Sequence, residues 1–139
     1  MSFVRVLPAW LHAIADYAVG AVLILAALIV GGSAGAVGTG VVVGATVLVV
    51  SMITRYPLGV IKILPFQVHS AGDYLAAVLL LAAPFALHFR HSDSGLAALY
   101  VVAGIAVLAV SMITNYQYRP STDAASRPAN EQARTVSAA

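Results

Sequence analysis

Two short motifs of one type hold the residues of this chain that are best suited to chemistry. Each reads Leu-Pro-x3-His-x3-Asp-Tyr, with the members Leu7, Pro8, His12, Asp16 and Tyr17 in the first copy and Leu64, Pro65, His69, Asp73 and Tyr74 in the second. Side chains four residues apart lie on the same face of a helix, one turn above the other. Each motif therefore predicts an imidazole beside a carboxylate on one helical face.

The segments that must position these motifs are strongly apolar. Of the 139 residues, 61% are hydrophobic and 9% are charged, whereas a soluble domain carries roughly 25% charged residues. There is no Asp, Glu, Lys or Arg between Ala18 and Met52, nor between Tyr74 and Phe89. Uncharged apolar stretches of about 18 residues or more are typical of membrane spans. Asp16 and Asp73 would then be carboxylates within spans, where they must face the bundle interior.

Four spans can be drawn, at about residues 10–30, 37–53, 68–87 and 96–113. The connections between the first two and between the last two are short, so each pair must form an antiparallel hairpin. We expect an all-α membrane protein with four transmembrane helices, built as two tandem helical hairpins. The transmembrane domain would cover residues 1–116, and the polar stretch 117–139 would be a disordered cytoplasmic tail.

The two hairpins repeat each other in sequence, at about residues 6–56 and 63–116. The His and Asp motifs align at an offset of 57 residues. Residues 47–56 align with 107–116 at an offset of 60, and eight of these ten positions are identical, which exceeds what shared hydrophobicity explains. A 2+2 internal repeat would place the two motifs at one depth, related by an axis along the membrane normal.

The basic residues predict the orientation. An inside N-terminus puts six of them in the cytoplasm, namely Arg5, Arg55, Lys62, Arg119, Arg127 and Arg134, and leaves Arg90 outside. We therefore expect a multi-pass protein of the inner (cytoplasmic) membrane with both ends inside. The basic residues stand singly beside apolar spans, which fits lipid headgroups and not nucleic acid. A cleaved signal peptide is the alternative for the first span, but a His and an Asp within it argue against cleavage.

Several roles stay open for the intramembrane polar cluster of His12, Asp16, His69 and Asp73, to which the adjacent tyrosines Tyr17 and Tyr74 are assigned as well. Hydrogen bonding between helices is the simplest role. A proton or ion relay, haem ligation by the two histidines, and a divalent metal on two imidazoles and two carboxylates are the others. The chain has no cysteine, which excludes thiolate chemistry.

Small residues and loop residues complete the candidates. Gly40, Gly44 and Gly104 would let helices approach closely, and Pro84 would kink or end the third helix. Thr54 and Thr114 would hydrogen-bond free carbonyls at helix ends. The loop with His88, Arg90, His91 and Asp93 would be a solvated turn, with a metal-binding loop as the alternative.

The central stretch from Thr54 to Asp73 resembles the SPW-repeat integral membrane proteins, which show Thr-Asp-Tyr, Leu-Gly, a basic residue, Ile-Pro and His-x3-Asp in this order. The chain departs from that pattern at Arg55 and Asn115, where the family has Asp, and at 83–85, where Ser-Pro-Trp has become Ala-Pro-Phe. The resemblance implies a small four-helix protein of two hairpins and implies no defined activity.

We therefore expect a small multi-pass membrane protein without evident enzymatic activity, acting as a structural or accessory subunit. Its partners would be the lipid bilayer and either further copies or a larger membrane complex. The alternative is a cofactor- or ion-handling protein that uses the polar cluster.

Overall fold

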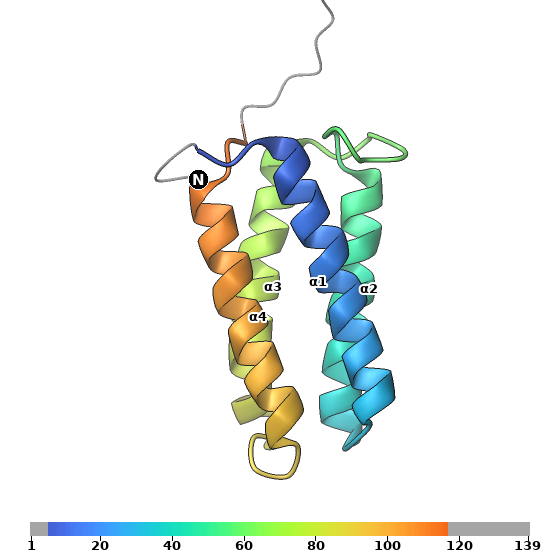
Figure 1. Ribbon diagram of the computed structural model, residues 1–139, viewed down its shortest axis with the longest axis vertical. Helices are drawn as coiled ribbons and strands as arrows, with labels where there is room; N and C mark the ends of the chain where they lie inside the picture. Colours follow the sequence, from blue (N-terminus) through green and yellow to red (C-terminus); the bar gives the residue numbers. More distant parts are fainter. Residues whose placement is uncertain (1–5, 117–139) are drawn as a thin grey trace, which may run out of the picture.

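The computed structural model describes residues 6–116, which form four helices: α1 (Ala9–Val30), α2 (Ala34–Ile53), α3 (Phe66–Ala86) and α4 (Ser94–Ile113). The helices lie side by side in a bundle, and both ends of the described chain meet at the same end of it (Figure 1). The expected spans agree with these bounds to within three residues. The predicted tail, 117–139, lies outside the described residues.

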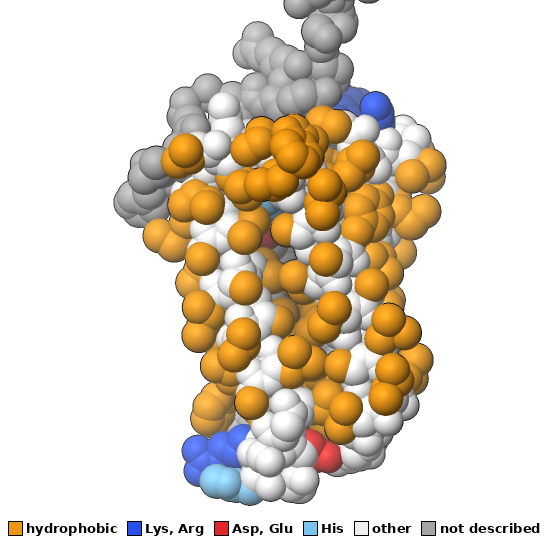
Figure 2. Space-filling view, viewed as in Figure 1, with side chains coloured by type: hydrophobic (Ala, Val, Ile, Leu, Met, Phe, Trp, Pro, Cys, Tyr) orange, Lys and Arg blue, Asp and Glu red, His pale blue; other side chains and the backbone are white. Residues whose placement is uncertain are grey.

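All four helices are long and apolar enough to cross a membrane. Large apolar side chains are exposed along them; Ile29 is 80% exposed and Leu28 is 62% exposed. On the face drawn in Figure 2, hydrophobic side chains cover the flank and charged side chains gather at its two ends. Because water would oppose so much exposed apolar surface, the solvent of this flank is lipid. The chain is an all-α, multi-pass membrane protein.

The bundle consists of two hairpins. The two helices within a hairpin pack tightly against each other, and the hairpins pack less tightly against one another. In the first hairpin α1 packs along α2, and in the second α3 packs along α4. The hairpins meet where α2 lies against α3 and α1 against α4, so α1 and α3 are diagonally opposed. Any direct interaction between α1 and α3 must therefore come from long side chains that reach across the axis.

Glycines allow the close packing within each hairpin. A Cβ at Gly44 would lie 2.8 Å from the carbonyl oxygen of Gly20, and one at Gly104 would lie 3.0 Å from that of Ala77. Gly40 lies equally close to the backbone of α1, where a Cβ would be 2.8 Å from the carbonyl oxygen of Leu23. All three glycines with a predicted packing role thus lie at helix contacts.

At the end of the bundle where the described chain begins and ends, the hairpins are tied by crossed backbone hydrogen bonds. The N–H of Leu7, before α1, donates to the carbonyl of Ile113 in α4 (3.0 Å). The N–H of Leu64, before α3, donates in the same way to Ile53 in α2 (2.8 Å). The segment that enters each hairpin is therefore held by the segment that leaves the other hairpin.

The opposite end is closed by an apolar cluster and by hydrogen bonds to one carboxylate. The cluster consists of Leu23, Ala36, Leu80, Phe89, Leu96, Ala97 and Tyr100. Asp93, just before α4, accepts hydrogen bonds from the N–H (3.1 Å) and hydroxyl (2.7 Å) of Ser33, and a third from the hydroxyl of Ser92 (2.9 Å). These bonds hold the pKa of the Asp93 carboxyl below its usual value.

Replacing Gly44 with alanine should destabilise the bundle, because the new methyl group would collide with the backbone of α1. We expect a loss of about 1–3 kcal/mol, the usual cost of overpacking. Gly38→Ala is the matched control, since a Cβ there would meet nothing within 4 Å and alanine favours a helix. Thermal unfolding in detergent measures both variants, and equal midpoints would contradict the packing role of Gly44.

Asp93→Asn should destabilise the protein in a pH-dependent way. A carboxyl whose pKa is lowered on folding contributes stability above its unfolded pKa, and that contribution is lost as pH falls through the folded pKa. The unfolding midpoints of wild type and variant should therefore differ most at neutral pH and converge in acid. A difference that does not change with pH would show that the negative charge of Asp93 is irrelevant to the tie between the hairpins.

Candidate functional site

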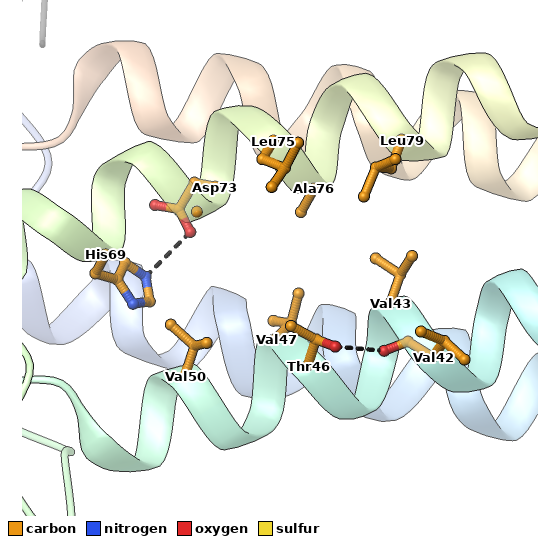
Figure 3. A pocket seen from close by; sticks show the side chains of 11 residues that line it. Val42, Val43, Thr46, Val47, Val50, His69, Asp73, Leu75, Ala76 and Leu79 are labelled. Carbon is orange, nitrogen blue, oxygen red and sulfur yellow. Dashed lines mark hydrogen bonds and ion pairs between the residues drawn. The ribbon is translucent and has the colours of Figure 1, made fainter.

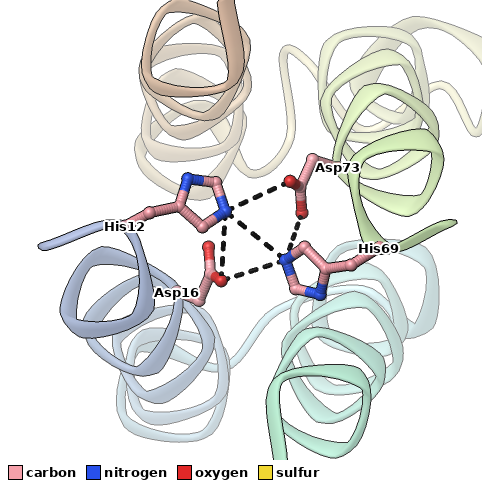
Figure 4. Close-up of side chains that lie close together, drawn as sticks. All are labelled: His12, Asp16, His69 and Asp73. Carbon is pink, nitrogen blue, oxygen red and sulfur yellow. Dashed lines mark hydrogen bonds and ion pairs between the residues drawn. The ribbon is translucent and has the colours of Figure 1, made fainter. Parts of the chain in front are cut away.

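His12 and Asp16 of α1 and His69 and Asp73 of α3 come together on the axis of the bundle; we call these four residues the quartet. Figure 4 looks along the bundle and shows the four side chains pointing at one another across the diagonal. Both histidines are 1% exposed, and the aspartates are 7% and 6% exposed. The quartet is the direct link between α1 and α3.

The quartet contacts involve one nitrogen of each ring, Nε2. The Nε2 atom of His12 lies 3.3 Å from Asp16 and 3.2 Å from Asp73, measured to Oδ2 of each. The Nε2 atom of His69 lies 3.1 Å from Oδ2 of Asp16 and 3.1 Å from Oδ1 of Asp73. The two Nε2 atoms are 3.4 Å apart. Each imidazole therefore contacts both carboxylates and the other imidazole.

Threonine hydroxyls determine the protonation of the other ring nitrogen. Nδ1 of His12 is 2.9 Å from the hydroxyl of Thr114, and Nδ1 of His69 is 2.9 Å from that of Thr54. Each hydroxyl donates its one proton to a backbone carbonyl, that of Val110 or Val50, at 2.7 and 2.6 Å. Each hydroxyl must then accept a hydrogen bond, so both rings carry a proton on Nδ1. A neutral ring thus presents the lone pair of Nε2 to the quartet.

The expectation that Thr54 and Thr114 bind helix-end carbonyls is confirmed. The sequence analysis missed that the same hydroxyls orient the histidines. Each threonine reaches the histidine of the opposite hairpin, so its role depends on the tertiary arrangement. A sequence signal for this role existed, since both threonines lie in the matching stretches 47–56 and 107–116.

Tyr56 and Tyr116 cover the quartet from the loop side and donate to it. The hydroxyl of Tyr56 donates to Asp16 (3.4 Å), and that of Tyr116 donates to Asp73 (3.0 Å). Burial raises the pKa of both phenols, so they remain protonated donors. With Phe66, whose ring centroid lies 4.7 Å from that of Tyr116, they form a buried aromatic cap. Bulk water is thereby excluded from this side of the quartet.

The quartet needs positive charge at its centre. With neutral rings, two carboxylates and two nitrogen lone pairs converge, and the phenol donors satisfy one oxygen of each carboxylate. Like charges this close repel strongly in a buried environment, and burial of uncompensated charge is costly. Either protons shared between the Nε2 atoms and the carboxyl groups or a bound cation must therefore hold the four groups together.

The quartet brings four ligand atoms close enough to share one metal ion. One ligand atom from each residue can be chosen so that all four lie within 4.8 Å of one another. Zn²⁺ binds nitrogen and oxygen at about 2.0–2.2 Å, so the ligand atoms of a tetrahedral site are about 3.3–3.5 Å apart. The Nε2–carboxylate and Nε2–Nε2 distances in the quartet, 3.1–3.4 Å, are close to these values, although Asp73 approaches His12 through Oδ2 and His69 through Oδ1.

Haem does not fit the same geometry. Axial ligation places a flat macrocycle between two imidazole nitrogens. Here the space around both Nε2 atoms is taken by the carboxylates of Asp16 and Asp73. The separation that suits a single ion leaves no room for the macrocycle.

The tyrosines assigned to the cluster from sequence lie outside the quartet. Tyr17 donates its hydroxyl to the carbonyl of Leu58 (3.0 Å), and Tyr74 is half-buried on α3. Neighbouring residues of a helix are about 100° apart around its axis, so a residue next to an inward-facing aspartate cannot point the same way. Tyr56 and Tyr116, whose hydroxyls donate to the aspartates, follow α2 and α4.

The other candidates make no comparable site. Within residues 6–116, the quartet is the group of three or more His, Asp or Glu side chains that could share an ion, and the loop of His88 and His91 forms none. Asp93, the acidic residue of that loop, is turned toward Ser33. Pro84 lies in the last turn of α3, which ends two residues later.

A valine at position 54 should change the protonation pattern of His69 alone. Removing the hydroxyl leaves Nδ1 of His69 without its acceptor, while His12 keeps Thr114. We expect ¹⁵N NMR of the imidazoles to show Nδ1-protonated rings in the wild type and a changed spectrum for one ring in Thr54→Val. Thr46→Val, which removes another hydroxyl from α2, is the control and should leave both rings unchanged. A wild-type ring protonated at Nε2 alone would contradict the assignment.

Comparison with known proteins adds no relative. The chain matches no family model, no curated protein and no solved structure. The interpretation of the quartet therefore depends on its geometry and chemistry.

Proposed function

We propose that this membrane protein binds one divalent transition-metal ion, with zinc the best fit, at the quartet of His12, Asp16, His69 and Asp73. The observation that carries the proposal is the convergence of two Nε2 lone pairs and two carboxylates, whose ligand atoms lie within 4.8 Å of one another. Both histidines are oriented for ligation by a hydrogen bond from Nδ1. Metal-binding histidines are held in this way in known metal sites, where the second hydrogen bond fixes the tautomer.

Charge balance supports a divalent ion. Two ionised aspartates and two neutral imidazoles carry a charge of −2, and an ion of charge +2 makes the buried centre neutral. Neutrality matters here because a net charge within the hydrocarbon region costs several kcal/mol. A monovalent ion would leave the centre charged.

The donor set favours zinc and similar ions over calcium or magnesium. Calcium takes six to eight oxygen ligands and magnesium six, usually with several waters. Two imidazoles in a buried site of four ligands suit zinc and its first-row neighbours. A site closed by four protein ligands is typical of structural zinc, whereas catalytic zinc keeps a position for water. We therefore assign the ion a structural role, consistent with the accessory, non-enzymatic protein expected from sequence.

The ion would join the two hairpins. Each hairpin supplies one histidine and one aspartate, and α1 and α3 have no direct backbone packing. Without the ion, the repulsion between the two carboxylates at the hairpin interface would no longer be compensated. Binding would therefore shift the protein toward the closed bundle, and any partner that recognises this bundle would depend on the metal.

A proton relay is the second candidate, because two protons on the Nε2 atoms would also neutralise the centre. Transfer across the membrane needs polar groups beyond the quartet. In the described part of the bundle, the buried residues that follow the quartet along α1 and α3 are Gly20, Leu23, Ala77 and Leu80, and the cluster around Phe89 closes the far end. The geometry thus favours a held ion over a conducted proton.

We propose that the chain is a divergent SPW-repeat protein, made of two copies of one hairpin and lying in the inner membrane with both ends in the cytoplasm. Support comes from the His-x3-Asp motifs, from the excess of Lys and Arg at the quartet end, and from burial. Residues 41–50 and 101–110 are buried, half-buried and exposed in the same order.

Elemental analysis of the protein purified without added metal should find about one zinc or similar ion per chain. His12→Ala with His69→Ala should abolish this content, because half of the ligands and all of the nitrogen donors are lost. His88→Ala with His91→Ala removes the same number of imidazoles outside the quartet and should retain the metal. A chelator should lower the unfolding temperature of the wild type, and zinc should restore it.

A second variant, which keeps the shapes of the side chains, distinguishes loss of the metal from misfolding. Asp16→Asn with Asp73→Asn keeps the volume of the side chains, removes the charge and should lose the ion while remaining a folded bundle by circular dichroism. A wild-type protein that contains no metal and gains no thermal stability from zinc would overturn the proposal. Hydrogen bonding between the helices would then be the role of the quartet.

A further inference from the structure

A groove runs along the seam between the hairpins, where α2 faces α3. At one end it reaches His69 and Asp73, and its walls are apolar, as Figure 3 shows for Val47 and Leu79. This part has a volume of about 290 Å³. A second hollow shares Val42, Val43 and Leu79 with it and continues to Gly38 and Leu87. From residue 50 to residue 38 the groove follows α2 for about 18 Å, at 1.5 Å per residue.

The groove lies within the spans, so acyl chains are the molecules that surround it. Its length and its narrow, apolar walls suit one extended chain. Such a groove could hold any lipid tail, and the tail alone would give no selectivity. What selects a lipid must lie at the membrane surface, at an end of the groove.

The loop of residues 54–65 joins the two helices that form the groove, and it is basic. Arg55 and Lys62 are both exposed, and the loop contains no Asp or Glu. Nε of Arg55 donates to the carbonyl of Lys62 (2.9 Å), which brings the two basic residues together. The loop folds back over the end of α2, where the N–H of Val60 donates to the carbonyl of Met52 (2.7 Å).

The same loop exposes large apolar side chains. Val60, Ile61 and Ile63 are 68%, 59% and 60% exposed. Figure 1 shows the loop projecting sideways from the bundle at its quartet end. Apolar and basic side chains on one projecting loop are typical of segments that lie in the headgroup region, where apolar groups enter the bilayer and cations meet phosphates.

We infer that the α2–α3 groove and the loop above it form a binding site for one anionic phospholipid. The phosphate lies on Arg55 and Lys62, and one acyl chain fills the groove between the hairpins. The inference is independent of the metal proposal, because it uses no residue of the quartet as a ligand.

The second seam of the bundle has a similar groove but no basic loop among its described residues. A similar groove between α1 and α4 is lined by Ala18, Val19, Ala106 and Val110. The described segments at its surface end, 6–8 and 114–116, contain no Lys or Arg. The apolar half of the site is thus present in both seams, whereas the basic loop belongs to one.

Native mass spectrometry of the detergent-purified protein can test the inference with three probes: phosphatidylglycerol, phosphatidylcholine with the same acyl chains, and soluble glycerol 3-phosphate. We expect one phosphatidylglycerol to bind more tightly than phosphatidylcholine, because phosphatidylcholine carries no net charge. Glycerol 3-phosphate should not bind at the same concentration. Equal binding of the two lipids, or binding of glycerol 3-phosphate as tight as that of phosphatidylglycerol, would overturn the inference.

Variants separate the two halves of the site. Arg55→Ala with Lys62→Ala should weaken binding of phosphatidylglycerol by about twenty-fivefold, if each basic residue contributes about fivefold. Thr46→Trp puts a large ring into the α2–α3 groove and should displace the lipid. Ala106→Trp is the matched control, since residue 106 holds the equivalent exposed position in the α1–α4 groove.

Equal loss of lipid in Thr46→Trp and Ala106→Trp would overturn the assignment to one groove, provided that circular dichroism shows both variants folded. The lipid measurement is repeated after chelation of metal. Retained lipid binding in metal-free protein separates this inference from the proposed metal site, so either can fail without the other.

Discussion

Charge compensation at one point on the bundle axis governs the rest of this structure. Two carboxylates lie between helices where water cannot solvate them, so every surrounding group must either donate to them or oppose their repulsion. Tyr56 and Tyr116 donate protons, and the imidazoles approach with their Nε2 atoms. The diagonal placement of α1 and α3 follows from this requirement, because four side chains need the width of the bundle to meet.

The polar contacts around the quartet occur in pairs, and each pair lies either within the hairpins or between them. The tyrosine contacts join residues of the same hairpin, whereas the threonine contacts and the crossed backbone bonds join residues of opposite hairpins. A hairpin on its own could therefore form the Tyr56–Asp16 contact but could not orient His12. Orientation of the rings is a property of the assembled bundle, and this explains why the tight packing lies within the hairpins while the chemistry lies between them.

The sequence was sufficient for the fold and for the four residues of the quartet. Charge-free stretches located the spans, and His-x3-Asp spacing put both pairs on inward faces. Sequence spacing could not tell which helices would be neighbours, so the diagonal relation of α1 and α3 required the structure. For the same reason Tyr17 was assigned to the cluster by proximity in sequence, although the inward tyrosine contacts come from Tyr56 and Tyr116. The direction of a side chain around a helix decides such contacts, and adjacent residues diverge.

Because each histidine has its threonine partner on the opposite hairpin, these hydrogen bonds also determine the order in which the polar centre can form during synthesis. Thr54 precedes His69 by 15 residues, so the second imidazole finds its acceptor as soon as the third helix inserts. Thr114 follows His12 by 102 residues, and the first imidazole must wait for the end of the fourth helix to emerge. Until then His12 lacks the acceptor of its Nδ1–H, and Asp73 lacks the hydrogen bond from Tyr116. A chain that ends before residue 114 would therefore lack a complete polar centre.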